Sequence, residues 1–244
     1  MKRLPFTDLH QHLLWGLDDG AQTPAQMRAL LNQNARQGVE IICATVHADL
    51  RRAPLDRTLY QRRLAEANAY CAQHQLPVRI LPGCEIMYSA AVPDWLMQGK
   101  LFPLGDSRYV LIEFPGNVSI SEIEDAANGL YRSGYRPILA HVERYRALVS
   151  APKRAMALRD EYGLIYQMDC STVLRPRNLR MRYFAYRMLR AQAIDLLASD
   201  AHNAGARPVR MRAAYRCIAE KYGARYARRL TCAGREVIGA PRGE

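Results

Sequence analysis

The segment VEIICATVH, residues 39–47, combines an almost continuous apolar run with a histidine at its end. A run of this kind, without polar alternation, is typical of a β-strand that is buried on both faces. Similar runs occur in YVLIEF (109–114), RPILA (136–140) and AIDLLAS (193–199). Because strands buried on both faces belong to parallel sheets that helices cover, these segments predict an α/β fold.

Strand-like and helix-like segments alternate along the chain. We expect strands near residues 4–10, 39–45, 77–84, 108–114, 136–140, 164–169 and 194–199. The helices between them have recognisable starts: Thr23 is a predicted N-cap before Pro24, and Ser121 with Glu124 matches a capping box. Seven strand–helix units without a GxGxxG fingerprint favour a closed or nearly closed parallel barrel over an open dinucleotide-binding sheet.

The bulk composition indicates one soluble domain. The chain has 244 residues, no fixed-period repeat and no break in composition, so we expect a single domain over residues 1–244. The last residues, about ten of them, are expected to form a flexible tail. No apolar stretch reaches the roughly 18 residues of a transmembrane helix, and no signal-like core follows MKRLP, which predicts a cytoplasmic protein without membrane insertion.

The net charge and the spacing of the cysteines limit the kinds of partner and catalytic nucleophile to expect. The net charge is +12, but the arginines are scattered over helix-like segments. This pattern indicates anionic partners without favouring nucleic acid. The six cysteines form no CxxC pair, and none has an arginine six residues downstream. We therefore expect reduced thiols and no Cys-x5-Arg phosphate loop, so a phosphatase of this sequence would not use a phosphocysteine.

Most histidines occur where predicted strands end. His74 lies in a polar, helix-like stretch, whereas the other five lie at or just beyond strand ends: His10, His12, His47, His141 and His202. Glu85, Glu113 and Asp200 close predicted strands in the same way. The C-terminal ends of the strands open onto one face of a parallel barrel, so these residues would converge there.

The convergent residues have the chemistry of metal ligands. The spacing of His10 and His12 places both imidazoles on one side of a strand, with Asp8 one step deeper, where it could orient a ligand histidine. Gathering several carboxylates without a cation would cost many kcal/mol or force their protonation. Histidine and carboxylate donors without thiolate suit Mn, Fe or Zn. We expect a multinuclear metal site.

Six segments carry a family resemblance: HQH (10–12), DDG (18–20), GCEIMY (83–88), DSRYVLIEF (106–114), AHVERY (140–145) and SDAHN (199–203). Together they resemble the polymerase-and-histidinol-phosphatase (PHP) superfamily. More narrowly, the chain is similar to the CpsB/CapC-type (YwqE-like) manganese-dependent protein-tyrosine phosphatases of bacterial capsule and exopolysaccharide biosynthesis. The resemblance implies a distorted (β/α)7 TIM-like barrel, three divalent metal ions (Mn²⁺, or Fe or Zn), and hydrolysis of phosphotyrosine by a metal-bridged hydroxide.

The resemblance also implies a role for each matched residue. One metal ion would take His10, His12, Glu85 and Asp200, a second Glu85, Glu113 and His141, and a third Asp19, His47 and His202. Arg144 and Arg207 match the phosphate-binding arginines, and Asp18 could contact a ligand. The implied partner is a phosphotyrosine protein, namely the tyrosine-rich tail of an autophosphorylating bacterial tyrosine kinase.

Some residues and functions remain open at this point. Glu143 is a candidate acid beside the site. Tyr88, Phe114 and Tyr145 follow ligand positions and could form an aromatic rim for phosphotyrosine or pack inside the protein. Another PHP phosphoesterase, acting on histidinol phosphate, a nucleotide or a DNA end, is an alternative function. A non-catalytic regulator that binds a phosphorylated partner is a second alternative. The sequence does not predict an oligomeric state.

Overall fold

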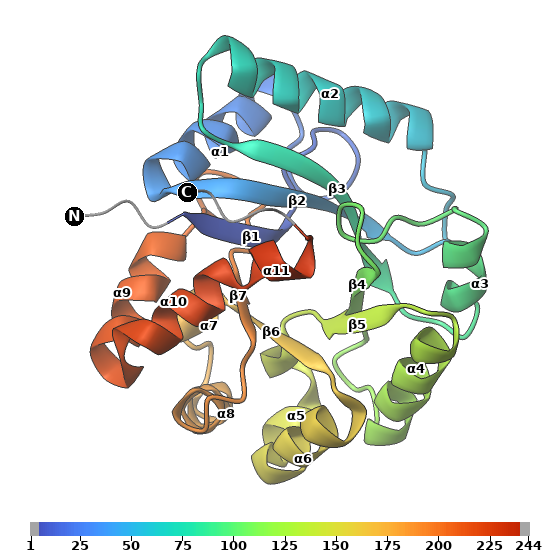
Figure 1. The fold of residues 1–244 in the computed structure, drawn as a ribbon, viewed down its shortest axis with the longest axis vertical. Helices are drawn as coiled ribbons and strands as arrows, with labels where there is room; N and C mark the ends of the chain where they lie inside the picture. Colours follow the sequence, from blue (N-terminus) through green and yellow to red (C-terminus); the bar gives the residue numbers. More distant parts are fainter. Residues whose placement is uncertain (1–4, 240–244) are drawn as a thin grey trace.

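The computed structural model describes residues 5–239, which form a parallel barrel surrounded by helices (Figure 1). Seven strands follow one another in sequence order, and every adjacent pair is parallel. They are β1 (Phe6–Gln11), β2 (Val39–Ala48), β3 (Arg79–Met87), β4 (Tyr109–Glu113), β5 (Arg136–Leu139), β6 (Ile165–Asp169) and β7 (Leu196–Ala198). A parallel bridge from Gln11 to Ala201 joins β1 to the segment after β7. The expected nearly closed (β/α)7 barrel is confirmed.

Helices connect the strands and cover the outside of the barrel (Figure 1). They are α1 (Pro24–Gln37), α2 (Arg57–Gln73), α3 (Val92–Met97), α4 (Ile120–Arg132), α5 (Arg146–Ser150), α6 (Pro152–Tyr162), α7 (Cys170–Leu174), α8 (Leu179–Arg190), α9 (Met211–Tyr222), α10 (Ala224–Cys232) and α11 (Gly234–Val237), with a 3₁₀ turn η1 (Val142–Arg144). None of the helices within residues 5–239 is long and apolar enough to span a membrane.

Two helix starts test the capping predictions. Thr23 is the N-cap of α1, and its side chain accepts a hydrogen bond from the Gln26 N–H, as expected. The capping box of α4 was wrongly predicted: Ser119 and Glu122 form it, two residues before Ser121 and Glu124. The sequence offers a serine at both positions, and at the earlier one the Glu122 N–H donates to Ser119 Oγ while the Ser119 N–H donates to Glu122 Oε2.

The alternation of side chains along the strands explains where the site lies. Ile41 and Cys43 of β2 belong to a small apolar cluster shared with other strands, whereas Ile42 belongs to the larger core that includes the helices. Because side chains alternate along a strand, Thr45 and His47 continue the row of Ile41 and Cys43. His47 pairs in register with Glu85 of β3. Apolar residues therefore fill the lower barrel and polar ones its C-terminal mouth.

The C-terminal segment differs from the expected flexible tail. The residues of that tail up to Gly239 are described, and Ile238 is buried in the inner cluster. α11 lies beside β1, where a Cβ atom on Gly234 would be 2.7 Å from Thr7 Cγ2. Only a glycine permits this close approach. Residues 240–244, together with residue 4 of the first predicted strand, lie outside the described residues.

Candidate metal centre

Glu85 lies at the centre of a cluster of histidines. Its Oε2 is 3.1 Å from His10 Nε2, His12 Nε2 and His47 Nδ1, and its Oε1 is 2.7 Å from His141 Nε2. The side chain is only 1% exposed. A carboxylate surrounded by imidazole nitrogens from four directions has the surroundings of a ligand shared between metal ions.

Asp200 approaches the same histidines from the segment after β7. Its Oδ1 lies 3.5 Å from His10 Nε2, 3.4 Å from His12 Nε2 and 3.5 Å from His202 Nδ1. Its φ of 50° is in the left-handed region, and its N–H donates to His10 O at 3.0 Å. His141 also has a positive φ, 32°. Such strain in residues other than glycine commonly occurs at functional sites.

Asp19 and Glu113 complete the cluster at its open side. Asp19 Oδ1 lies 3.3 Å from His47 Nε2 and 3.2 Å from His202 Nε2. Glu113 Oε1 lies 3.1 Å from His47 Nδ1. The side chain of His47 is 39% exposed and that of Asp19 62%, so solvent reaches the cluster here. All nine sequence-predicted ligands are thus brought together, although they come from six strands or strand ends and one loop.

The groups with metal-binding spacing differ slightly from the expected ligand sets. Three groups have ligand atoms within 4.8 Å of one another: His12–Asp19–His47–His202, His10–His12–Glu85 and His47–Glu85–Glu113. His12 and His47 each occur in two groups. His47 joins Glu85 and Glu113 in place of His141, whose Nε2 is 3.7 Å from Glu113 Oε2, and neither His141 nor Asp200 belongs to any of the three groups. The allocation of each residue to one metal ion therefore remains a prediction.

Hydrogen bonds hold three histidines with Nε2 directed into the cluster. Gln167 Oε1 accepts the His141 N–H, which fixes the orientation of the side-chain amide. The same oxygen lies 3.1 Å from His10 Nδ1, so His10 Nδ1 must carry the proton and donate it. Asp18 Oδ2 accepts from His12 Nδ1 at 2.7 Å, and the Asp200 carbonyl from His202 Nδ1 at 3.0 Å. Each partner leaves the Nε2 lone pair free for a metal ion.

The electrostatics fit a site for divalent cations. Glu85 Oε2, His141 Nδ1 and His202 Nε2 are buried and make no well-oriented hydrogen bond within the described residues, although Glu85 Oε2 and His202 Nε2 have a nitrogen or oxygen 3.1–3.2 Å away. Burial and the neighbouring His12 lower the pKa of His202 to about 4, which keeps this imidazole neutral. Burial opposes protonation of His10, yet Glu85 and Asp200 raise its pKa to about 9. A metal ion would replace that proton. Nitrogen and oxygen donors without sulfur suit Mn, Fe or Zn.

Both predicted phosphate-binding arginines lie beside the cluster. Arg144 Nη2 donates to Asp200 Oδ2 and, at 2.6 Å, to Asp169 Oδ2. Arg207 Nη2 donates to Asp200 Oδ2 at 2.7 Å. Asp169 and Gln167 are functional candidates that the sequence analysis missed. They are inward-facing residues at the end of β6, and Gln167 Nε2 donates to Asp169 Oδ1 at 3.0 Å. Their position at the end of a predicted strand could have identified both as candidates.

Two carboxylates near the cluster, those of Asp8 and Glu143, accept hydrogen bonds from backbone N–H groups. Asp8 accepts the N–H groups of His10 (3.3 Å) and Ser199 (3.1 Å), so it joins β1 to the segment after β7. Its carboxylate therefore binds backbone groups and not an imidazole, contrary to the expectation from the sequence. Glu143 Oε1 accepts the Asp169 N–H at 2.9 Å. Burial and the nearby Asp169 raise the pKa of Glu143 to about 8. Glu143 is 1% exposed, so a substrate in the cluster would not reach it.

The three predicted aromatic residues form a packed group. Tyr145 is fully buried, its hydroxyl accepts the Phe114 N–H at 3.3 Å, and the two rings are 5.8 Å apart. Phe114 is 6% exposed, and its ring lies 5.4 Å from that of Tyr88. The structure favours packing over an aromatic rim for Phe114 and Tyr145, because neither offers a face to solvent.

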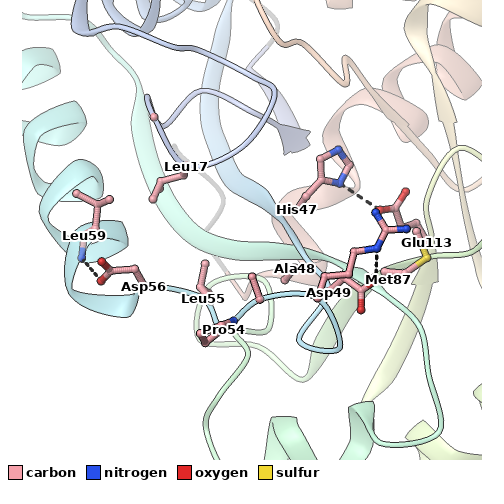
Figure 2. A pocket seen from close by; sticks show the side chains of 13 residues that line it. Leu17, His47, Ala48, Asp49, Pro54, Leu55, Asp56, Leu59, Met87 and Glu113 are labelled. Atoms are coloured by element: carbon pink, nitrogen blue, oxygen red, sulfur yellow. Dashed lines mark hydrogen bonds and ion pairs between the residues drawn. The ribbon is translucent and has the colours of Figure 1, made fainter.

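An apolar cleft instead adjoins the cluster on the side of β2–β4. Figure 2 shows this cavity of about 570 Å³, with His47 and Glu113 at one end. The apolar side chains of Leu17, Ala48, Pro54, Leu55, Leu59 and Met87 form much of the remaining wall. Three charged residues also line it: Asp49, Arg52 and Asp56. The loop of residues 49–56, between β2 and α2, supplies much of this wall. The cleft provides space for an apolar group next to two candidate metal ligands, His47 and Glu113.

The site geometry agrees with a family model described as "Capsular polysaccharide synthesis, CpsB/CapC", which matches residues 6–238. The chain belongs to the CpsB/CapC family. The match extends from the start of β1 to the residue after α11, so it includes all nine clustered histidines and carboxylates and both arginines.

Two curated CpsB/CapC relatives are tyrosine-protein phosphatases. CpsB of Streptococcus pneumoniae is 34% identical over 236 residues, which cover 91% of this chain and 93% of that protein. YwqE of Bacillus subtilis (strain 168) is 28% identical over 224 residues, which cover 92% of this chain and 88% of YwqE. Both relatives match this CpsB/CapC member over almost their whole length.

Solved structures agree with this family and fold. One, described as part of "Crystal structures of YwqE from Bacillus subtilis and CpsB from Streptococcus pneumoniae, unique metal-dependent tyrosine phosphatases", has a TM-score of 0.88 at 27% identity. It covers 97% of this chain and 95% of the other. A putative histidinol phosphatase from Listeria monocytogenes has a TM-score of 0.52 at 10% identity, covering 80% of this chain and 95% of the other. That likeness shows the fold alone.

Proposed function

We propose that this CpsB/CapC member is a metal-dependent protein-tyrosine phosphatase. The observation that carries the proposal is the convergence of nine imidazole and carboxylate side chains at one mouth of the barrel, seven of them with metal-binding spacing, next to two arginines and a partly apolar cleft. The names of the similar phosphatases support the reaction. A non-catalytic regulator is not favoured, because neither a ligand nor an arginine is missing.

The arginines are placed to bind the transferred phosphoryl group. Arg144 and Arg207 both donate to Asp200 Oδ2, the oxygen that faces away from the histidines. A phosphate dianion at the cluster would lie between these guanidinium groups and the metal ligands. Charge-assisted hydrogen bonds of this kind stabilise charge on the phosphoryl oxygens as the bond to the leaving group breaks.

Metal ions bound at the cluster would act as Lewis acids and lower the pKa of water so that a hydroxide nucleophile exists near neutral pH. We assign up to three divalent ions, with Mn²⁺ expected and Fe or Zn compatible with the same donors. Among the chain's own residues, Gln167, Asp18 and the Asp200 carbonyl hold the histidine tautomers that ligation requires.

The leaving group and the cleft favour tyrosine. A tyrosine hydroxyl has a pKa of about 10, so its phenolate leaves with less assistance than a serine alkoxide. Glu143 is buried and turned towards Asp169, which agrees with a reaction that uses no dedicated carboxylic acid. The apolar cleft beside His47 and Glu113 offers room for the phenyl ring.

We further infer the setting of the reaction from the family description of capsular polysaccharide synthesis. The substrate we assign is the tyrosine-rich tail of a bacterial tyrosine kinase, and the compartment is the cytoplasm. All six cysteines are free thiols, and Cys170, which follows β6 directly, is buried against Met211. Burial raises the pKa of its thiol and that of Cys84, which precedes Glu85, so neither is a ready nucleophile beside the metal site.

Three substrates compared with Mn²⁺ present test the proposal. We expect turnover of a phosphotyrosine peptide and at least a hundredfold lower kcat/KM for histidinol phosphate and for single-stranded DNA. The Arg144→Gln variant should raise KM for the peptide while it keeps the bound metal. Faster turnover of histidinol phosphate or DNA than of the peptide would contradict the proposed function.

A further inference from the structure

A second cavity adjoins the metal centre on the side opposite the apolar cleft. It has a volume of about 170 Å³ and lies over the ends of β5–β7, whereas the apolar cleft lies over β2–β4. Arg144, Asp169, Asp200 and Arg207 form its inner wall, which it shares with the metal centre. Arg175, Arg177 and Arg210 form its outer rim.

The cavity has an excess of positive charge. Its five arginines face only two carboxylates, Asp169 and Asp200. Both carboxylates already accept hydrogen bonds from the inner arginines. The guanidinium groups of Arg175, Arg177 and Arg210 make neither an ion pair nor a hydrogen bond with any residue between 5 and 239. Three positive charges therefore surround a concave surface without a counter-charge.

Rigid segments hold these arginines around the cavity. Arg175 and Arg177 flank Pro176 in the short connection between α7 and α8, and Asn178 caps α8 directly afterwards. On the other side, Asn203 Oδ1 accepts the N–H groups of Gly205, Ala206 and Arg207 at 3.1, 2.7 and 3.2 Å. Proline and a closed side-chain turn reduce the freedom of the two loops, so less entropy is lost when an anion binds.

We propose that this cavity is a second anion-binding subsite, which takes an acidic or phosphorylated side chain close to the phosphotyrosine in the same substrate chain. The inference rests on the proposed phosphatase function and adds a sequence preference to it. A phosphoryl group at the metal centre would lie against Arg144 and Arg207, which also form the inner wall of the cavity. A neighbouring carboxylate or phosphate on the same peptide would then meet Arg175, Arg177 and Arg210.

Matched peptides and variants test the subsite. Three peptides differ only in the residue next to a phosphotyrosine, which is Gln, Glu or a second phosphotyrosine. The small substrate p-nitrophenyl phosphate reports on the metal centre alone. The variants are R175Q/R177Q and R210Q. R180Q is the matched control, because Arg180 is exposed in the same region but lies outside the cavity. Circular dichroism confirms that each variant is folded.

We expect the wild type to hydrolyse the Glu-flanked peptide with a kcat/KM about five times that for the Gln-flanked one, mainly through KM, since exposed Arg–carboxylate pairs are individually weak. The doubly phosphorylated peptide should show a larger preference if phosphate is the better occupant. R175Q/R177Q and R210Q should reduce both preferences towards unity, leave p-nitrophenyl phosphate turnover unchanged, and differ from R180Q. Added salt should reduce the wild-type preference.

Other results separate the two levels of inference. Equal kcat/KM for all three peptides, or a preference that persists in the cavity variants, would overturn the subsite while the phosphatase function stands. An equal loss in R180Q would assign the preference to general surface charge and also overturn the subsite. A loss of p-nitrophenyl phosphate turnover in the cavity variants would place these arginines in the reaction instead. No hydrolysis of any peptide by the wild type would contradict the proposed function itself.

Discussion

Gln167 connects three parts of the metal centre through one buried amide, so its replacement by leucine is a sharp test of the site. Its Oε1 accepts from His10 Nδ1 (3.1 Å) and from the His141 N–H (2.8 Å). Its Nε2 donates to Asp169 Oδ1 (3.0 Å), and Asp169 in turn accepts from Arg144. Leucine has a similar volume but can make none of these hydrogen bonds.

The size of the effect follows from the bonds that are lost. Two buried N–H donors would lose their acceptor, at about 1–3 kcal/mol each, so the free energy of unfolding should fall by about 2–6 kcal/mol. Loss of the partner that orients a ligand histidine typically reduces metal affinity or activity by about 10–100-fold. That reduction corresponds to about 1.4–2.7 kcal/mol of binding free energy.

The assay combines Mn²⁺ titration calorimetry, urea unfolding and phosphotyrosine-peptide turnover for Gln167→Leu. Asn68→Leu is the control: Asn68 is a partly buried amide on α2 that accepts the Ile80 N–H at 3.1 Å and donates to Ile80 O at 3.0 Å. It should lose stability without losing metal affinity. If Gln167→Leu binds Mn²⁺ as tightly as the wild type, the argument that Gln167 fixes the His10 tautomer is refuted.

Three other changes test separate parts of the account. Gly20→Ala should abolish tight Mn²⁺ binding in calorimetry, because the new Cβ would lie 2.1 Å from His12 O and displace the loop that carries Asp19; wild-type affinity would contradict this. Leu55→Asp in the apolar cleft should raise KM for a phosphotyrosine peptide about tenfold and leave inhibition by inorganic phosphate unchanged; an unchanged KM would place the ring elsewhere. In the metal-free protein, the His10 pKa of about 9 exceeds its ordinary value of 6.5, so the stability from its protonation is complete below pH 6.5 and is lost as the pH rises through 9. Urea unfolding should show a decrease of about 3 kcal/mol from this group, absent in His10→Asn; identical pH profiles would contradict it.

The barrel could be predicted from sequence because its strands carry an unusually clear signal. Apolar runs such as residues 109–112 have no alternation to confuse with an amphipathic helix, and each is followed by a polar residue at the mouth. The exact residues at which strands and helices end were harder to predict. β2 extends to Ala48, three residues past the predicted end, because its pairing with β3 continues through His47 and Glu85 to Ala48 and Ile86.

The ligands were more predictable than the residues that support them. A histidine or carboxylate at a strand end is conspicuous in sequence, whereas Gln167 is an ordinary polar residue whose role depends on lying between His10 and His141. For the same reason the spacing along β1 suggests that Asp8 could orient a ligand histidine, although its carboxylate accepts backbone N–H groups. Side-chain partners across a barrel depend on tertiary geometry, which spacing along one strand does not contain.

Metal dependence of phosphotyrosine hydrolysis is the central claim, and one measurement tests it directly. Phosphate release from a phosphotyrosine peptide is followed for the purified protein, after complete chelation with the residual metal quantified, and after stepwise addition of Mn²⁺. We expect that activity disappears on chelation and returns in proportion to the metal bound. The Glu85→Gln variant should regain little activity when Mn²⁺ is added. Full activity in protein shown to be free of metal would contradict the account.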